Sequence, residues 1–192
     1  MGKKEMKIFL KKCLSFIVCK KNKVSYTKGA YWGYNAKVVN LGGYLIFGQK
    51  IIIRPGTILF TKENLSKLIL DDYVEIGRNS TISARNKVEI KKHVITGPNV
   101  FISDSDHKYE NIDLPISQQG GESKGEVFID EGSWIGTNCV IIGNVHIGKH
   151  CIIGANTVVT KDIPDYCVAA GVPARIIKRY NFETKEWGRV SE

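Results

Sequence analysis

The segment VFIDEGSWIGTNCVIIGNVHIGKHCIIGANTVVTKDI, residues 127–163, decides the fold. An aliphatic side chain returns at every sixth position: Ile129, Ile135, Ile141, Ile147, Ile153 and Val159. A compact side chain follows four positions after each: Ser133, Cys139, Val145, Cys151, Thr157 and Ile163. Neither a helix nor an ordinary strand keeps one face in register at this period. A six-residue repeat predicts a parallel β-helix, in which three hexads complete one triangular coil and the aliphatic residues point inward.

The same period extends toward the N-terminus with interruptions. Three further sets of residues follow it: Ile46, Ile52 and Ile58; Leu70, Ile76 and Ile82; and, after a two-residue slip, Ile90, Thr96 and Ile102. We expect all of them to point into the solenoid, with Thr96 as a polar residue in an inward slot. The hexads supply about six coils, roughly 30 Å of solenoid at the spacing of neighbouring strands.

Composition indicates one domain of ordinary globular size. The chain has 192 residues, 43% of them hydrophobic, and no apolar run long enough to span a membrane. Its five cysteines include no Cys-x-x-Cys pair. Cys139 and Cys151 occupy compact inward positions of the repeat. This pattern favours core residues in a reducing, cytoplasmic compartment over a disulfide framework.

The positive charge is concentrated at the N-terminus. Residues 1–23 hold eight lysines and one glutamate, which leaves the rest of the chain close to neutral although the net charge is +9. A nucleic-acid-binding protein should instead carry its basic residues on the folded surface, so we expect no nucleic-acid partner. Apolar residues at helical spacing predict an amphipathic helix over residues 3–20. This helix either packs against the solenoid or a neighbouring subunit, or it contacts an anionic membrane at its inner face.

We divide the chain into an N-terminal helix and connector (residues 1–35), a repeat domain (36–180) and a C-terminal tail (181–192). Pro164 ends the regular hexads, and the segment after it should cap the open coil, with a short helix over residues 174–180.

Residues 103–126 interrupt the repeat and predict a loop inserted at a corner of a coil. Asp104, Asp106 and His107 open this insertion, next to the rigid coil. An imidazole oriented by a carboxylate is a good general base. The absence of a Ser or Cys nucleophile motif nearby favours direct deprotonation of an acceptor, and either aspartate could orient the ring.

The repeat and several later motifs resemble the hexapeptide-repeat acyltransferases, in particular the galactoside and maltose O-acetyltransferases and the sugar O-acetyltransferases of cell-envelope polysaccharide synthesis. The resemblance covers about residues 70–180. It rests on the Asp-His loop with Pro115-Ile116, on Trp134-Ile135-Gly136, on IGANTVVTKDIP at residues 153–164 and on AGVPAR at 170–175. It implies a left-handed, all-β parallel β-helix that assembles as a homotrimer, with acetyl-CoA bound between neighbouring solenoids.

The resemblance also implies roles for individual residues. His107 matches the catalytic histidine. Six positions match residues along acetyl-CoA: Trp134, Thr137, Ala155, Thr160, Lys161 and Arg175. Lys161 and Arg175 could bond to its phosphates. Ser83 aligns with an acceptor-site asparagine of the sugar acetyltransferases, and no second histidine stands near Ser105, where the polysaccharide branch often has one.

These features predict an acetyl-CoA-dependent O-acetyltransferase acting on a sugar hydroxyl, with His107 as base. N-acetylation of a nucleotide-linked amino sugar would use the same machinery. A metal site like that of the γ-class carbonic anhydrases is a third reading, because His107 would stack one coil below His146 if the insertion replaces no turn. A non-catalytic solenoid for assembly is a fourth.

Overall fold

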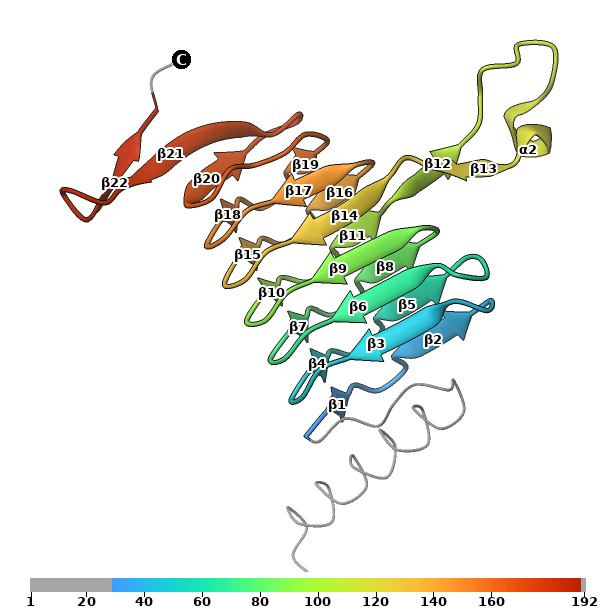
Figure 1. Cartoon of the computed structure of the whole chain (residues 1–192), viewed down its shortest axis with the longest axis horizontal. Helices are drawn as coiled ribbons and strands as arrows, with labels where there is room; N and C mark the ends of the chain where they lie inside the picture. The colour runs from blue at the N-terminus through green and yellow to red at the C-terminus, as the bar shows by residue number, and fades with distance from the viewer. Residues whose placement is uncertain (1–28, 191–192) are drawn as a thin grey trace, which may run out of the picture.

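The computed structural model describes residues 29–190, which form a parallel β-helix with three faces (Figure 1). The first face contains β1 (Tyr31–Trp32), β4 (Ile52–Ile53), β7 (Glu75–Ile76), β10 (Ile95–Thr96), β15 (Trp134–Ile135), β18 (Ile152–Ile153) and β20 (Cys167–Ala170). The second contains β2 (Lys37–Asn40), β5 (Ile58–Thr61), β8 (Thr81–Ala84), β11 (Phe101–Ser103), β16 (Val140–Ile142) and β19 (Val158–Val159). The third contains β3 (Tyr44–Phe47), β6 (Lys67–Leu70), β9 (Lys87–Ile90), β14 (Glu126–Ile129) and β17 (Val145–Ile147).

The hexad residues of the C-terminal half form the core, as the sequence predicts. The six aliphatic hexad residues from Ile129 to Val159 are each at most 1% exposed. The compact positions are buried as well, and their polar members bond to the next coil. Ser133 Oγ donates to the Gly148 carbonyl at 2.8 Å, and Cys139 Sγ lies 3.0 Å from the Gly154 carbonyl. These contacts satisfy polar groups that would otherwise be costly inside the solenoid.

The corner between the first and second faces is formed by left-handed asparagines. Asn79, Asn99, Asn138 and Asn156 have φ of 53°, 58°, 57° and 59°. Asparagine tolerates this conformation better than most residues. Asn99 Nδ2 donates to Asn138 Oδ1, and Asn138 Nδ2 donates to Asn156 Oδ1, both at 3.0 Å. This amide ladder ties successive coils together at a turn of constant length.

The predicted inward position of Thr96 is confirmed, since this residue is buried and its Oγ1 accepts a hydrogen bond from Gly77 N at 2.8 Å. The inward register of the first coils was wrong by one residue. Ile46 is 50% exposed, while Phe47, Ile53 and Leu59 are buried. In this part of the chain apolar residues occupy consecutive positions, both those that point inward and those that point outward. The six-residue period alone therefore did not fix which of them points inward.

The C-terminal segment is an antiparallel extension of the first face, and the short helix predicted for residues 174–180 was wrong. β21 (Arg175–Asn181) pairs with β20, and β22 (Glu186–Arg189) pairs with β21. The open edge of β20 offers unpaired backbone groups, and a strand satisfies them directly where a helix does not. These strands project from one side of the solenoid (Figure 1).

The predicted helix over residues 3–20 lies outside the described residues, and so does most of the predicted connector. The first strand, β1, begins at Tyr31 and pairs with β4. None of the helices within residues 29–190 is long and apolar enough to cross a membrane.

Candidate active site

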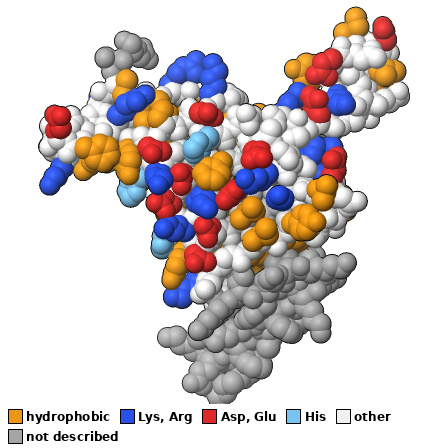
Figure 2. Space-filling view, in the orientation of Figure 1, with side chains coloured by type: hydrophobic (Ala, Val, Ile, Leu, Met, Phe, Trp, Pro, Cys, Tyr) orange, Lys and Arg blue, Asp and Glu red, His pale blue; other side chains and the backbone are white. Residues whose placement is uncertain are grey.

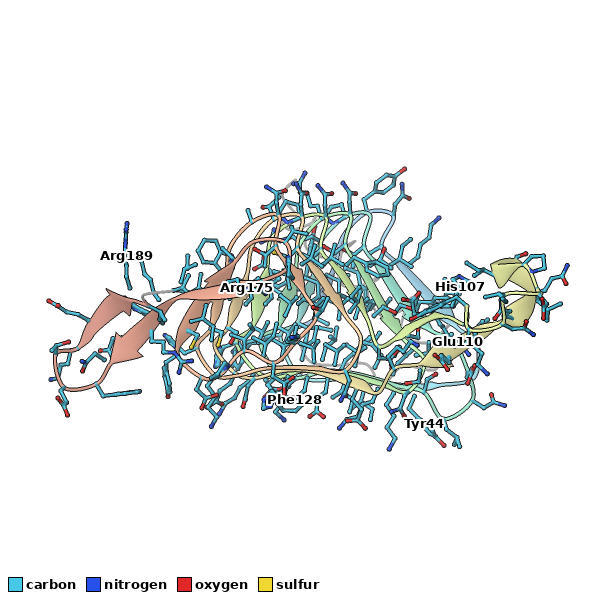
Figure 3. The ribbon with its side chains drawn as sticks, turned by 90° about the horizontal axis from the view of Figure 1, so that it is seen from above. Tyr44, His107, Glu110, Phe128, Arg175 and Arg189 are labelled. Carbon is cyan, nitrogen blue, oxygen red and sulfur yellow. The ribbon has the colours of Figure 1, made fainter. Side chains whose placement is uncertain are left out.

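The insertion forms an arm at the corner between the second and third faces. β12 (Ser105–His107) and β13 (Gly121–Ser123) pair antiparallel, with His107 opposite Gly121, and the one-turn helix α2 (Ile116–Gln119) lies near the tip. The arm projects away from the solenoid on the side opposite the C-terminal strands, and His107 lies at its base (Figures 1 and 3). The prediction of a corner insertion is therefore confirmed.

Asp104 fixes the base of the arm to the neighbouring coil. Its side chain is fully buried, and its carboxylate accepts three backbone N–H groups: Arg85 N at 2.8 Å, Asn86 N at 2.7 Å and Lys87 N at 2.6 Å. Both carboxylate oxygens are thereby occupied by the turn below. Asp106 is exposed, and its Oδ1 accepts from the backbone N–H of His107 at 2.8 Å. Each aspartate thus binds backbone in this structure, and no hydrogen bond joins either carboxylate to the imidazole.

A groove of about 760 Å³ runs between the arm and the second face. One wall carries Phe101, Val140 and Ile142, which project outward from neighbouring coils. The opposite side carries His107, Asp106 and the arm backbone at Gly120 and Gly121. The site therefore offers an apolar wall facing an imidazole, an arrangement suited to a substrate with one hydrophobic part and one polar reacting group.

Hydroxyl and cationic groups complete the groove. Ser103, Ser105, Ser117, Thr160, Lys62, Arg85 and Lys124 line it. The Lys62 ammonium donates to Ser105 Oγ at 2.7 Å, and Ser103 Oγ bonds to the Ser105 carbonyl at 3.1 Å. Burial lowers the pKa of Lys62 below its usual value, and the Arg85 guanidinium lowers it further. The carboxylates of Asp104, Asp106 and Glu63 oppose both effects.

The structure places the residues expected along acetyl-CoA on successive coils. Thr160 lines the groove with His107. Thr137 and Ala155 lie on adjacent coils at the asparagine corner, where Asn156 N donates to the Thr137 carbonyl at 2.8 Å. Trp134 is on the first face with its side chain 50% exposed. Trp134 and His107 therefore lie on different parts of one chain.

The two expected phosphate ligands lie near the last coil. Lys161 is exposed, directly after Thr160. Ala174 N donates to the Val158 carbonyl at 2.9 Å, which brings Arg175 to the same end of the solenoid. Arg175 lines a second groove of about 610 Å³ with Lys178 and Arg189. His107 and Arg175 belong to separate elements, as Figure 3 shows.

Ser83 lies beneath this region and not in the groove. It is 3% exposed, and its hydroxyl has no hydrogen-bond partner within the described part of the chain. In the register of the second face it stands between Phe60 and Ser103. Sequence reasoning missed Lys62, Arg85 and Lys124. The stacking of Thr61 on Ala84 could have pointed to the first two, since it brings residues 62 and 85 to one corner.

The stacking of His107 below His146, on which the metal reading rested, was wrong. Phe128 occupies that position, because β14 continues the coil and His107 is carried out on the arm. Phe128 and His146 meet edge to face with ring centroids 5.0 Å apart. His93 and His150 lie at left-handed turn positions with φ of 61° and 53°.

The third face has the character of an ordinary solvated surface. Lysines and carboxylates alternate over it (Figure 2), including the pairs Lys87–Glu89 at 3.0 Å and Lys91–Asp71 at 3.4 Å. Such interspersed, half-buried surface pairs of both signs favour no single ligand charge. The groove under the arm is therefore a stronger candidate for the active site than the third face.

Residues 126–161 match the family described as "Bacterial transferase hexapeptide (six repeats)". The galactoside O-acetyltransferase of Lactococcus lactis is 33% identical over 114 residues, which cover 58% of this chain and 54% of that protein. The "putative lipopolysaccharide biosynthesis O-acetyl transferase WbbJ" of Escherichia coli is 34% identical over 127 residues, 62% of this chain and 64% of that protein. The chain thus spans roughly half to two thirds of the length of these relatives.

A solved galactoside acetyltransferase, in complex with coenzyme A, superposes with a TM-score of 0.51 at 26% identity and covers 81% of this chain and 74% of its own. The predicted resemblance to the hexapeptide-repeat acyltransferases is confirmed by these matches.

Proposed function

We propose that this protein transfers an acetyl group from acetyl-CoA to a sugar hydroxyl, with His107 as the general base. The observation that carries the proposal is the groove that brings His107 and Thr160 together, one expected at the reacting hydroxyl and the other along acetyl-CoA. Both are held by the rigid coils, His107 through the Asp104 anchor and Thr160 through the turn after β19. The relatives named as a galactoside O-acetyltransferase and as a putative lipopolysaccharide biosynthesis O-acetyl transferase support the same assignment.

In this mechanism one imidazole nitrogen of His107 accepts the proton of the sugar hydroxyl. The oxygen bonds to the acetyl carbon, the carbon–sulfur bond breaks, and the leaving thiolate takes the proton from the imidazolium. A positioned base of this kind contributes about 10²- to 10⁴-fold in rate. Phe101, Val140 and Ile142 would exclude water from one side of the reacting groups, and Lys161 and Arg175 would bind phosphates of the cofactor.

The test is the His107→Ala variant with acetyl-CoA and a panel of sugars, followed by thiol release. Turnover should fall by about 10²-fold or more with unchanged affinity for acetyl-CoA. His146→Ala is the matched control, since His146 is exposed on the third face and lies outside the groove. Near-normal transfer by the His107 variant would end the mechanism. Amino sugars in the panel separate N- from O-acetylation, because the amide product resists mild alkali and the ester does not.

We also infer a homotrimer with sites shared between chains. Trp134 and the His107 groove lie on different parts of one solenoid. One acetyl-CoA therefore contacts both most simply when it lies between two chains, with Trp134 from one chain and the groove from its neighbour. Sedimentation equilibrium should give about three chains per particle. A monodisperse monomer that binds coenzyme A would contradict the shared site.

A further inference from the structure

The groove under the arm carries an excess of positive charge. Three cationic side chains line it, those of Lys62, Arg85 and Lys124, against one carboxylate, that of Asp106. Arg85 forms an ion pair with Glu63, and Lys124 forms one with Glu122. Neither of these carboxylates lines the groove, although each offsets part of the charge of its partner.

Lys62 is the cation of the groove that lacks an ionic partner. Within residues 29–190 its ammonium forms no ion pair, and its one hydrogen bond in this part of the chain goes to the neutral Ser105 hydroxyl at 2.7 Å. Burial and the nearby Arg85 guanidinium both lower the pKa of this ammonium, and the carboxylates of Asp104, Asp106 and Glu63 only partly oppose them, so its surroundings compensate its charge incompletely. An anion placed beside it would supply the missing interaction.

Arg85 provides a second unsatisfied donor at the same place. Its Nε is buried without a hydrogen-bond partner in the described part of the chain, while Nη1 bonds to Glu63. Buried donors are almost always paired in folded proteins, so this nitrogen leaves the Arg85 guanidinium incompletely satisfied beside the groove. Lys62 and Arg85 stand on successive coils of one corner, where Lys62 N donates to the Ala84 carbonyl at 2.8 Å.

We propose that the acceptor carries an anionic group, a carboxylate or a phosphate, which Lys62 binds with support from Arg85 while His107 addresses the hydroxyl. This inference rests on the proposed function for the role of His107, but its binding part stands without turnover. A neutral sugar would leave the Lys62 ammonium desolvated and unpaired, whereas an anionic one would form a charge-assisted hydrogen bond. The two sources of such an anion are a uronic acid and a phosphorylated or nucleotide-linked sugar.

The test measures equilibrium binding by calorimetry with three pairs: galactose and galacturonate, glucose and glucose 6-phosphate, and glucose and a nucleoside-diphosphate glucose. The wild-type protein is compared with Lys62→Met, which keeps the stem and removes the charge, and with Lys62→Arg, which restores it. Lys67→Met is the control, because Lys67 is exposed on β6 outside the groove. Acetyl-transfer rates are recorded for the same acceptors.

We expect at least one anionic sugar to bind about tenfold or more tightly than its neutral partner, the range of a hydrogen bond to a charged group. Lys62→Met should remove that difference and leave acetyl-CoA binding unchanged, and Lys62→Arg should restore most of it. The pair that shows the effect identifies carboxylate or phosphate.

Equal binding of neutral and anionic sugars, or weakened acetyl-CoA binding in Lys62→Met, would overturn the inference. Transfer to neutral sugars alone would overturn it and leave the acetyltransferase proposal intact. Lys62-dependent binding of an anionic sugar without transfer to any acceptor would support the anion site and count against the proposed reaction.

Discussion

Replacement of Asp104 should destabilise the protein more than it alters the chemistry at His107. Asp104 is fully buried and accepts the backbone N–H groups of Arg85, Asn86 and Lys87 at 2.6–2.8 Å. Asp104→Ala leaves three donors without a partner, each costing about 1–3 kcal/mol. The turn lies next to solvent, so water can reach part of it, and we expect the lower end of this range, about 3 kcal/mol in total. For a chain of this size that corresponds to a drop in Tm of roughly 6–12 °C.

The comparison with Asp104→Asn sharpens this prediction. Oδ2 accepts from two of the donors and Oδ1 from one, and an amide offers only one acceptor oxygen. The asparagine variant should therefore lose an intermediate amount, about 1–3 kcal/mol. Asp106→Ala is the matched control, because Asp106 is exposed and bonds only to the adjacent His107 N–H, and it should change stability by about 0.5 kcal/mol or less.

The assay is thermal unfolding of the four proteins at one concentration, with acetyl transfer measured well below Tm. If the free energy of unfolding of Asp104→Ala lies within about 1 kcal/mol of the wild-type value, the three hydrogen bonds do not anchor the arm. A variant with unchanged melting and a turnover as low as that of His107→Ala would return Asp104 to the role of orienting the imidazole.

Three further outcomes are expected. Lys161→Ala and Arg175→Ala should each raise the KM for acetyl-CoA about tenfold with little change in the KM for the sugar, and equal effects in initial-rate kinetics would count against phosphate binding. Burial raises the pKa of the Cys151 thiol to about 11, so iodoacetamide at pH 8 should leave it unlabelled in peptide maps until the protein unfolds. Because this pKa lies above the unfolded value of 9.0, the protonated Cys151 thiol contributes to the stability of the folded protein. This contribution is complete below pH 9.0 and is lost as the pH rises toward 11. Deletion of residues 1–20 should reduce binding to anionic vesicles in a flotation assay while turnover of a free sugar continues, and lost activity in an intact assembly would show that the segment helps to build the site.

The sequence predicts the solenoid best where the six-residue period runs without interruption. From Ile129 to Val159 six inward aliphatic positions follow one another at constant spacing, glycine comes directly after three of them, and all six are buried. Around Ile46 and Ile52 aliphatic residues are consecutive, and two registers fit equally well. Packing against the neighbouring coils then decides that Phe47 and Ile53 point inward, and the six-residue period carries no information about this packing.

The site was predictable only where a motif marks it. His107 and Thr160 follow from the resemblance, and both line the groove. Lys62 and Arg85 carry no local signal, because they reach the groove through the stacking of three coils. The role of Asp104 was likewise hidden, since its partners are backbone groups about 18 positions away in the chain.

The arm should be separable from the solenoid, because the other turns of the same corner show what the coil itself requires. Two residues suffice between β8 and β9 and between β16 and β17. Lys124 N donates to the Asp104 carbonyl at 2.7 Å, so the ends of the arm already lie side by side. Deletion of residues 105–124 joins Asp104 to Gly125 in a turn of the same length and keeps the Asp104 carboxylate on the coil below. Gly125 has a φ of 134°, a conformation that glycine adopts without strain.

This deletion variant should retain the wild-type far-ultraviolet circular dichroism of a β-solenoid and a Tm within about 5 °C, since few buried apolar contacts are lost. It should have no acetyl transfer, because His107 is removed. It should also lose the preference for anionic sugars although Lys62 and Arg85 remain, because the arm wall that holds the sugar beside them is removed. Acetyl-CoA should still bind through Lys161 and Arg175. Unfolding of the variant would show that the arm stabilises the corner, and a retained preference for anionic sugars would show that the corner binds the anion without the arm.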